Sequence, residues 1–205
     1  MKDYLFNPFR FIAGGKALIL GGITMVLTAL VGWLSHTHFP DVISLKSSPG
    51  YPFYYLLFQT FVNWLLLSSL IYGYSKVVSK SSVRALDIFG TQALARFPYL
   101  PGAFIGFSGS MERFAKYILS KTMQPDLDNS ITPTDIGIAV LIIILSLLLL
   151  IWLFVLMYNA FSLSSNLKGS KAVIGLIACL IISVIAAQFI NYQALAWFNL
   201  TVPHL

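Results

Sequence analysis

Residues 136–158 read IGIAVLIIILSLLLLIWLFVLMY and contain no charged side chain. At about 1.5 Å per residue, a helix of this length crosses the roughly 30 Å hydrocarbon core of a bilayer. The whole chain of 205 residues has the same character, because 58% of it is hydrophobic and only 10% is charged. Soluble domains are about 25% charged. The composition therefore predicts an integral membrane protein of the all-α class.

Working outward from this run, further segments have the length and apolar character of membrane spans. They cover residues 17–35, 53–75, 88–107 and 172–194. We therefore expect a single domain over residues 1–205, built as a bundle of five transmembrane helices. Residues 4–12 and 111–121 are short and amphipathic, which is typical of helices that lie on the membrane surface.

The basic residues of the loops predict the orientation, because cytoplasmic loops carry an excess of lysine and arginine. If all five segments cross and the N-terminus is cytoplasmic, the inner side holds Lys2, Arg10, Lys16, Lys76, Lys80, Arg84, Lys168 and Lys171. The outer side then holds Lys46, Arg113, Lys116 and Lys121. Eight against four favours an N-in/C-out topology, with Leu205 outside. A cleaved signal peptide in place of the first span is the alternative.

The third segment is unusual because it contains an arginine and two prolines. Pro98 and Pro101 lack a backbone N–H, so a proline kink is expected here. The carbonyls of Leu94 and Phe97 would then lose their helical donors. In one interpretation Arg96 donates to these carbonyls and extends toward the cytoplasmic surface.

In the other interpretation, Arg96 belongs to a polar site that binds an anion. Gln92 lies one turn before it, Gln59 and Asn63 lie one turn apart on the second span, and Gln188 lies on the fifth. Ionisable residues inside spans commonly mark functional sites. A phosphate or carboxylate held by the planar guanidinium would be the ligand of such a site.

The basic residues after the second span form a second candidate surface. Lys76, Lys80 and Arg84 recur at every fourth position, which predicts a basic helical face on the cytoplasmic side. Each lysine or arginine there would attract anionic lipid headgroups. The net charge of +6 is assigned to this membrane edge and not to nucleic acid.

Catalytic and cofactor motifs give no alternative assignment. The sequence has no phosphate-binding glycine loop, HExxH motif or nucleophile elbow. His36, His38 and Asp41 form only a weak metal pattern in a loop. We therefore expect no enzyme activity, no cofactor and no bound metal.

The order of these features resembles the Yip domain family of five-span membrane proteins. The likeness covers an NPF opening before the first span, the loop SKVVSKSSVRALDIFG, the broken ALARFPYLP, the Trp-bearing LLIWLFVLMYNAFS and the loop KGSKAVIG. Eukaryotic members bind Rab-type GTPases and shape secretory membranes, and they usually have a long hydrophilic cytoplasmic arm before the first span. This chain has about 16 residues there, so it resembles the short prokaryotic branch and Rab binding is not implied.

The resemblance to the prokaryotic branch does not fix a biochemical role. We expect a non-enzymatic protein of a bacterial cytoplasmic (inner) membrane that organises the membrane or binds lipid or a membrane-protein partner. Two alternatives are a small transporter or permease subunit with an anion path at Arg96, and an accessory subunit of a larger membrane complex. The sequence leaves the oligomeric state open.

Overall fold

The computed structural model describes residues 5–47, 50–122 and 131–200, and the regular secondary structure of this part is helical apart from one short strand pair. Four helices are long and apolar enough to cross a membrane: α2 (Gly14–Leu34), α3 (Phe53–Val78), α7 (Pro133–Ser165) and α8 (Ser170–Trp197). The predicted all-α class and membrane character are therefore confirmed. Each of these helices contains nearly all of a predicted span.

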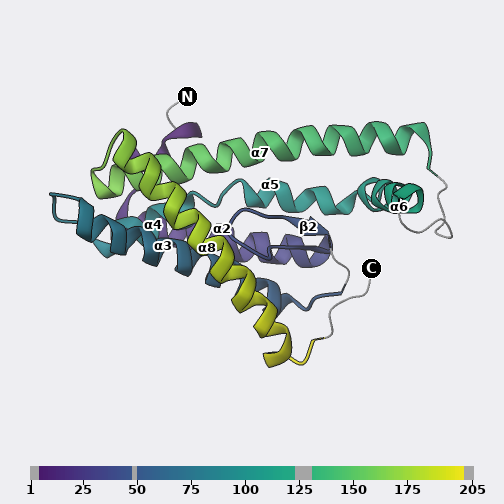
Figure 1. The fold of residues 1–205 in the computed structure, drawn as a ribbon, viewed down its shortest axis with the longest axis horizontal. Coiled ribbons are helices and arrows are strands. Elements are labelled where there is room, and N and C mark those ends of the chain that lie inside the picture. The colour runs from purple at the N-terminus through teal and green to yellow at the C-terminus, as the bar shows by residue number, and fades with distance from the viewer. Residues whose placement is uncertain (1–4, 48–49, 123–130, 201–205) are drawn as a thin grey trace.

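The third predicted span is not one kinked helix. It consists of α4 (Ala85–Leu94), a turn at residues 95–98, α5 (Tyr99–Ala103) and the 3-10 helix η2 (Phe104–Phe107). The expectation of a single kinked helix over 88–107 is therefore wrong. Pro98 has no N–H with which to continue α4, and the N–H of Arg96 already bonds the carbonyl of Ala93 in 3-10 fashion at 3.2 Å. The broken segment still extends alongside α7 (Figure 1).

Helices α2 and α4 approach each other closely because glycine lines their contact. A Cβ atom on Gly21 would lie 2.5 Å from the backbone carbon of Ala93. A Cβ atom on Gly90 would lie 2.4 Å from the carbonyl oxygen of Gly14. Neither position has room for a side chain, so these glycines fix how deeply α4 packs against the first span.

Two short segments flank the long helices near residues 4–12 and 111–121, and their position on a membrane surface stays a prediction. The first contains η1 (Pro8–Arg10), and Trp152 Nε1 and Asn159 Nδ2 of α7 donate to the carbonyls just before it at 2.9 and 2.7 Å. The second is α6 (Ser110–Thr122), where Arg113 pairs with Asp135 of α7 at 2.6 Å. Tyr4, at the start of the first segment, lies outside the described residues.

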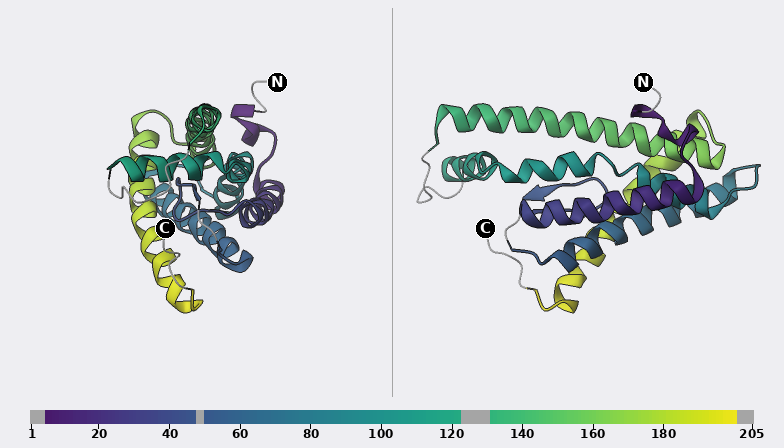
Figure 2. Two further views of the ribbon diagram at one scale, coloured as in Figure 1. Left: turned by 90° about the vertical axis from the view of Figure 1, so that its right-hand side faces the viewer. Right: turned by 180° about the vertical axis from the view of Figure 1, so that it is seen from behind.

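The connections gather at two opposite ends of the molecule (Figures 1 and 2). One end holds η1, the α3–α4 connection and the α7–α8 connection. The other end holds α6 and the antiparallel strands β1 (Thr37–His38) and β2 (Lys46–Ser47). Lys2 and the predicted outer C-terminus, residues 201–205, lie outside the described residues.

Candidate functional site

The loop that joins α2 to α3 folds into the bundle and forms the centre of the site. Phe39, Asp41 and Val42 are 3%, 1% and 0% exposed, respectively. A buried loop needs partners for its backbone N–H and C=O groups. In this structure, polar side chains from three neighbouring segments supply them.

Helix α3 provides the first set of partners, Gln59 and Asn63, which lie one turn apart. Gln59 Oε1 accepts from the N–H of Phe39 at 3.2 Å. Asn63 Nδ2 donates to the carbonyls of Phe39 and Asp41 at 2.9 and 2.8 Å. Both side chains are about 1% exposed, so water does not compete for these bonds.

Helix α8 provides the second set. Asn191 Nδ2 donates to Asn63 Oδ1 at 3.1 Å and to the carbonyl of Pro40 at 2.9 Å. Gln188 Nε2 donates to Asp41 Oδ2 at 3.1 Å. The loop is thus held between the second and the last of the long helices, and Tyr99 of α5 adds a bond from its hydroxyl to the carbonyl of Val42.

The carboxylate of Asp41 is fully engaged within the loop. Its Oδ1 accepts from the N–H groups of Ile43 and Ser44 at 2.9 and 2.8 Å. Burial raises the pKa of Asp41, but the hydrogen bonds from Ser44, Ile43 and Gln188 outweigh it and hold the pKa below its usual value. Asp41 is therefore a charged acceptor that orders the loop.

Arg96 lies beside this network and is only 3% exposed. Its Nη2 donates to the backbone carbonyl of Asn63 at 2.8 Å. The carbonyls of Leu94 and Phe97 accept instead from the N–H groups of Phe97 and Leu100 at 3.1 and 3.0 Å. The interpretation that Arg96 caps these carbonyls and extends to the cytoplasmic surface is therefore wrong.

The structure brings four of the five predicted polar-site residues to this network. Arg96 and Gln59 both contact the Phe39–Asn63 region, and Gln188 joins through Asp41. Gln92 does not join it, since its Nε2 donates to the carbonyl of Met157 on α7 at 3.2 Å.

A small cavity of about 10 Å³ adjoins Arg96. Its lining residues are Met25, Thr28, Phe39, Thr60, Asn63, Arg96 and Tyr99. A cavity needs roughly 10–15 Å³ to hold one water molecule. A phosphate or carboxylate does not fit, so the structure offers no room for the predicted two-pronged grip on such a group.

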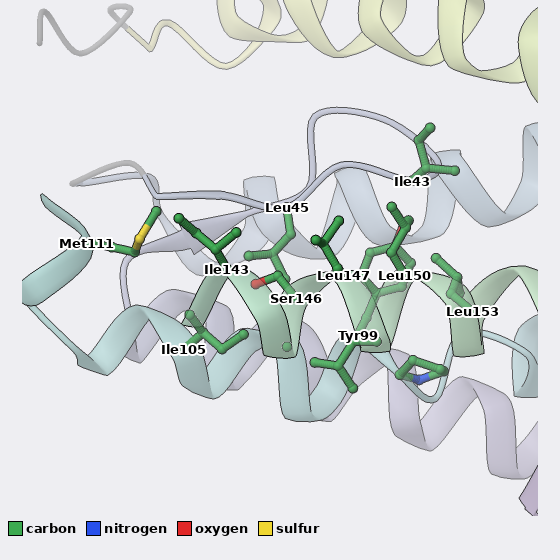
Figure 3. Close-up of a pocket in the computed structure, with 13 residues that line it drawn as sticks. Ile43, Leu45, Tyr99, Ile105, Met111, Ile143, Ser146, Leu147, Leu150 and Leu153 are labelled. Atoms are coloured by element: carbon green, nitrogen blue, oxygen red, sulfur yellow. The ribbon is translucent and has the colours of Figure 1, made fainter. Parts of the chain in front are cut away.

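A larger apolar groove of about 350 Å³ lies between the same loop, the broken segment and α7 (Figure 3). Its lining residues are Ile43, Leu45, Pro98, Tyr99, Gly102, Ile105, Met111, Ile143, Ser146, Leu147, Leu149, Leu150 and Leu153. Sequence reasoning missed this groove. The small residues Gly102 and Ser146, placed among large apolar ones, were the only signal for it.

The residues of the other two candidate sites, the weak metal pattern and the basic surface, do not form the predicted arrangements. Among the described residues, no group of three His, Cys, Asp or Glu side chains is arranged to hold a metal ion. Lys76, Lys80 and Arg84 are all exposed at one end. They do not form a helical face, because α3 ends at Val78 and α4 begins at Ala85. The prediction of a basic helical face is therefore wrong.

Comparison with known proteins does not extend this description. The chain matches no family model, no curated protein and no solved structure. The resemblance to the Yip domain family thus stays an expectation drawn from the order of spans and loops.

Proposed function

We propose that the protein is a non-enzymatic, multi-pass membrane protein that binds lipid, with one acyl chain in the groove between α5 and α7. The observation that carries this proposal is the groove itself. Its volume of about 350 Å³ is typical of a small-molecule site. Its walls are apolar except for Ser146 and Tyr99, and the Tyr99 hydroxyl is already bonded to the carbonyl of Val42.

The position of the groove matches an acyl chain. Its α7 wall extends from Ile143 to Leu153, which is about 15 Å at the helical rise and half of the roughly 30 Å hydrocarbon core. Leu147 on this wall is 55% exposed, so the groove opens on the surface of an apolar helix. In a bilayer such a surface contacts lipid tails.

The proposal includes five crossings with the N-terminus in the cytoplasm. This topology is supported by the broken segment, which extends beside α7. It is also supported by the excess of basic residues in the loops that lie at the same end of the molecule as η1. In this topology the exposed Lys76, Lys80 and Arg84 face the cytoplasm and attract anionic headgroups. A role in organising the membrane is compatible with lipid binding at both places.

The permease alternative has less support. The hollow at Arg96 has a volume of about 10 Å³, which is at the lower limit for a single water molecule. A transport path for a phosphate or carboxylate would need a larger hollow beside Arg96.

Photocrosslinking with a lipid that carries a diazirine on its acyl chain tests the proposal in membranes. Ser146→Trp fills the groove, whereas Leu148→Trp places the same side chain at the next exposed position that does not line it. We expect the lipid probe to label peptides of α5 and α7 in the unaltered protein and in Leu148→Trp, and to lose this labelling in Ser146→Trp.

Equal labelling of both variants would show that the groove is not the lipid site. A single protein crosslinked stoichiometrically to these positions, in place of lipid, would favour the accessory-subunit alternative.

A further inference from the structure

The apolar groove differs at its two ends, which Figure 3 shows at Met111 and at Leu153. At one end the lining residues Leu153 and Pro98 are buried, and Leu153 is only 3% exposed. At the other end Ile143 is 39% exposed, and Met111 of α6 contributes to the wall. The groove is therefore accessible near α6 and ends inside the bundle near Leu153.

Helix α6 lies at the depth of lipid headgroups. It runs across the direction of α7, since Figure 1 shows α6 almost end-on and Figure 2 shows α7 end-on with α6 extended. Asp135, which binds α6, lies about 18 Å from the middle of the charge-free run 136–158 at the helical rise. In a bilayer, the headgroup region extends from roughly 15 to 22 Å from the centre.

Arg113 of α6 offers an unused donor at this depth. Its Nε and Nη2 donate to Asp135 Oδ1 at 2.9 and 2.6 Å, and Nη2 also donates to Ser110 Oγ at 3.2 Å. Its Nη1 makes no hydrogen bond to the described residues, and the side chain is 51% exposed. Ser110 directly precedes Met111, so this polar cluster adjoins the accessible end of the groove.

We propose that the groove holds a phospholipid of the leaflet at the α6 end, with its phosphate bound by Arg113 Nη1 and its acyl chain directed toward Leu153. This inference rests on the proposed function, because it requires lipid in the groove. In the N-in topology, this leaflet is the outer one. A guanidinium N–H donates a strong, charge-assisted hydrogen bond to phosphate. Lys116 lies one turn further along the same face of α6, and its side chain is 56% exposed, so it adds a second cation.

The opposite orientation has no such support. It would place the phosphate near Leu153, and none of the residues that line the groove is charged. An unpaired phosphate among buried apolar side chains is costly. The groove and α6 together therefore match the polarity of one lipid orientation.

The depth of the acyl chain is measured on the unaltered protein in nonionic detergent, with two photoreactive phospholipids. One carries a diazirine next to the ester of its acyl chain, and the other carries it next to the terminal methyl group. We expect the first to label peptides that contain Met111 or Ile143, and the second to label the peptide that contains Leu153. The reverse order would overturn the proposed orientation.

Substitutions on α6 test the headgroup contact. A diacylglycerol with the same photoreactive chain serves as the ligand without phosphate. The unaltered protein should bind the phospholipid about tenfold more tightly than the diacylglycerol, as expected for one hydrogen bond to a charged group. Arg113→Gln should lose this preference. Lys121→Gln makes the same change of charge about 12 Å further along α6 and should keep it.

Asp135→Asn separates a headgroup contact from a merely structural role of the ion pair. It removes the carboxylate that holds Arg113 but leaves the guanidinium in place. The preference for phospholipid should therefore survive in Asp135→Asn. Its loss in both Asp135→Asn and Arg113→Gln would show that the ion pair only positions α6.

Failure of this inference differs from failure of the proposed function. If neither the phospholipid nor the diacylglycerol labels α5 or α7, the groove holds no lipid and both proposals are wrong. If both label these helices with equal affinity, or if Arg113→Gln keeps the preference, lipid occupies the groove but Arg113 does not bind its phosphate.

Discussion

Asn63 is the residue on which the buried loop depends most, and Asn63→Leu tests this dependence. The Asn63 side chain donates to the carbonyls of Phe39 and Asp41 at 2.9 and 2.8 Å and accepts from Asn191 at 3.1 Å. Leucine is similar in size but forms none of these bonds. Two carbonyls of the loop and one amide of α8 would then lose a partner at a position that is 1% exposed.

The size of the effect follows from the number of bonds. Hydrogen bonds between membrane helices contribute about 0.6 kcal/mol each on average. A buried polar group left without a partner costs about 1–3 kcal/mol in soluble proteins. Three lost bonds therefore predict that the free energy of unfolding falls by about 2–5 kcal/mol, with the loop released from the bundle.

Thr60→Val is the matched control for this measurement. Thr60 lies on the same helix, is 6% exposed and bonds only the carbonyl of Leu56 on its own helix at 2.8 Å. Its loss should cost less than about 1 kcal/mol. Unfolding is measured in detergent micelles, together with hydrogen exchange of the amides in residues 36–47. Equal stability and equal exchange in the two variants would refute the idea that Asn63 holds the loop.

Further changes test the packing, the titration and the topology. Gly90→Ala should destabilise the fold by about 1–3 kcal/mol, because the added Cβ would clash with the carbonyl oxygen of Gly14. Gly22→Ala adds a Cβ with no atom near it and should leave the stability unchanged. Thermal unfolding distinguishes the two variants. Burial and the nearby charge of Lys46 lower the pKa of His38 to about 4 from 6.5. As the pH falls, His38 is therefore protonated in the unfolded chain before it is protonated in the folded chain. The free energy of unfolding should fall by at most about 3 kcal/mol between pH 6.5 and 4, and His38→Gln should reduce this loss. In Cys179→Ser protein, an impermeant thiol reagent applied to intact cells should label Thr122→Cys but not Ser82→Cys; the reverse result contradicts the N-in topology.

The long helices were predictable because their signal is local. Residues 136–158 lie within α7, and 172–194 lie within α8. The helices are longer than the predicted spans. An uncharged run marks only the part of a helix that lies in the hydrocarbon core, whereas the ends of the helix depend on capping. At the start of α7, Thr132 and Asp135 form a capping box outside the apolar run.

The buried loop was not predictable from local pattern. Its bonds join residues far apart in sequence: Asn191 and Pro40 are separated by 151 positions, and Gln188 and Asp41 by 147. The sequence predicts a polar site at the residues of the second and fifth spans, with an anion as its ligand. In the structure these side chains mainly satisfy the backbone of the chain itself.

Tyr99 connects the two hollows and shows why the break in the third segment matters. Its ring lines both the apolar groove and the cavity beside Arg96, and it packs edge-on against Phe39 with the ring centroids 5.4 Å apart. Pro98 cannot continue the preceding helix, and α5 begins at Tyr99, directly after it. Pro98 therefore determines the position of the Tyr99 side chain that lines both hollows. Because Tyr99 lines both hollows, a lipid chain in the proposed groove site would pack against its ring. Occupation of the groove is therefore expected to stabilise the arrangement of the loop.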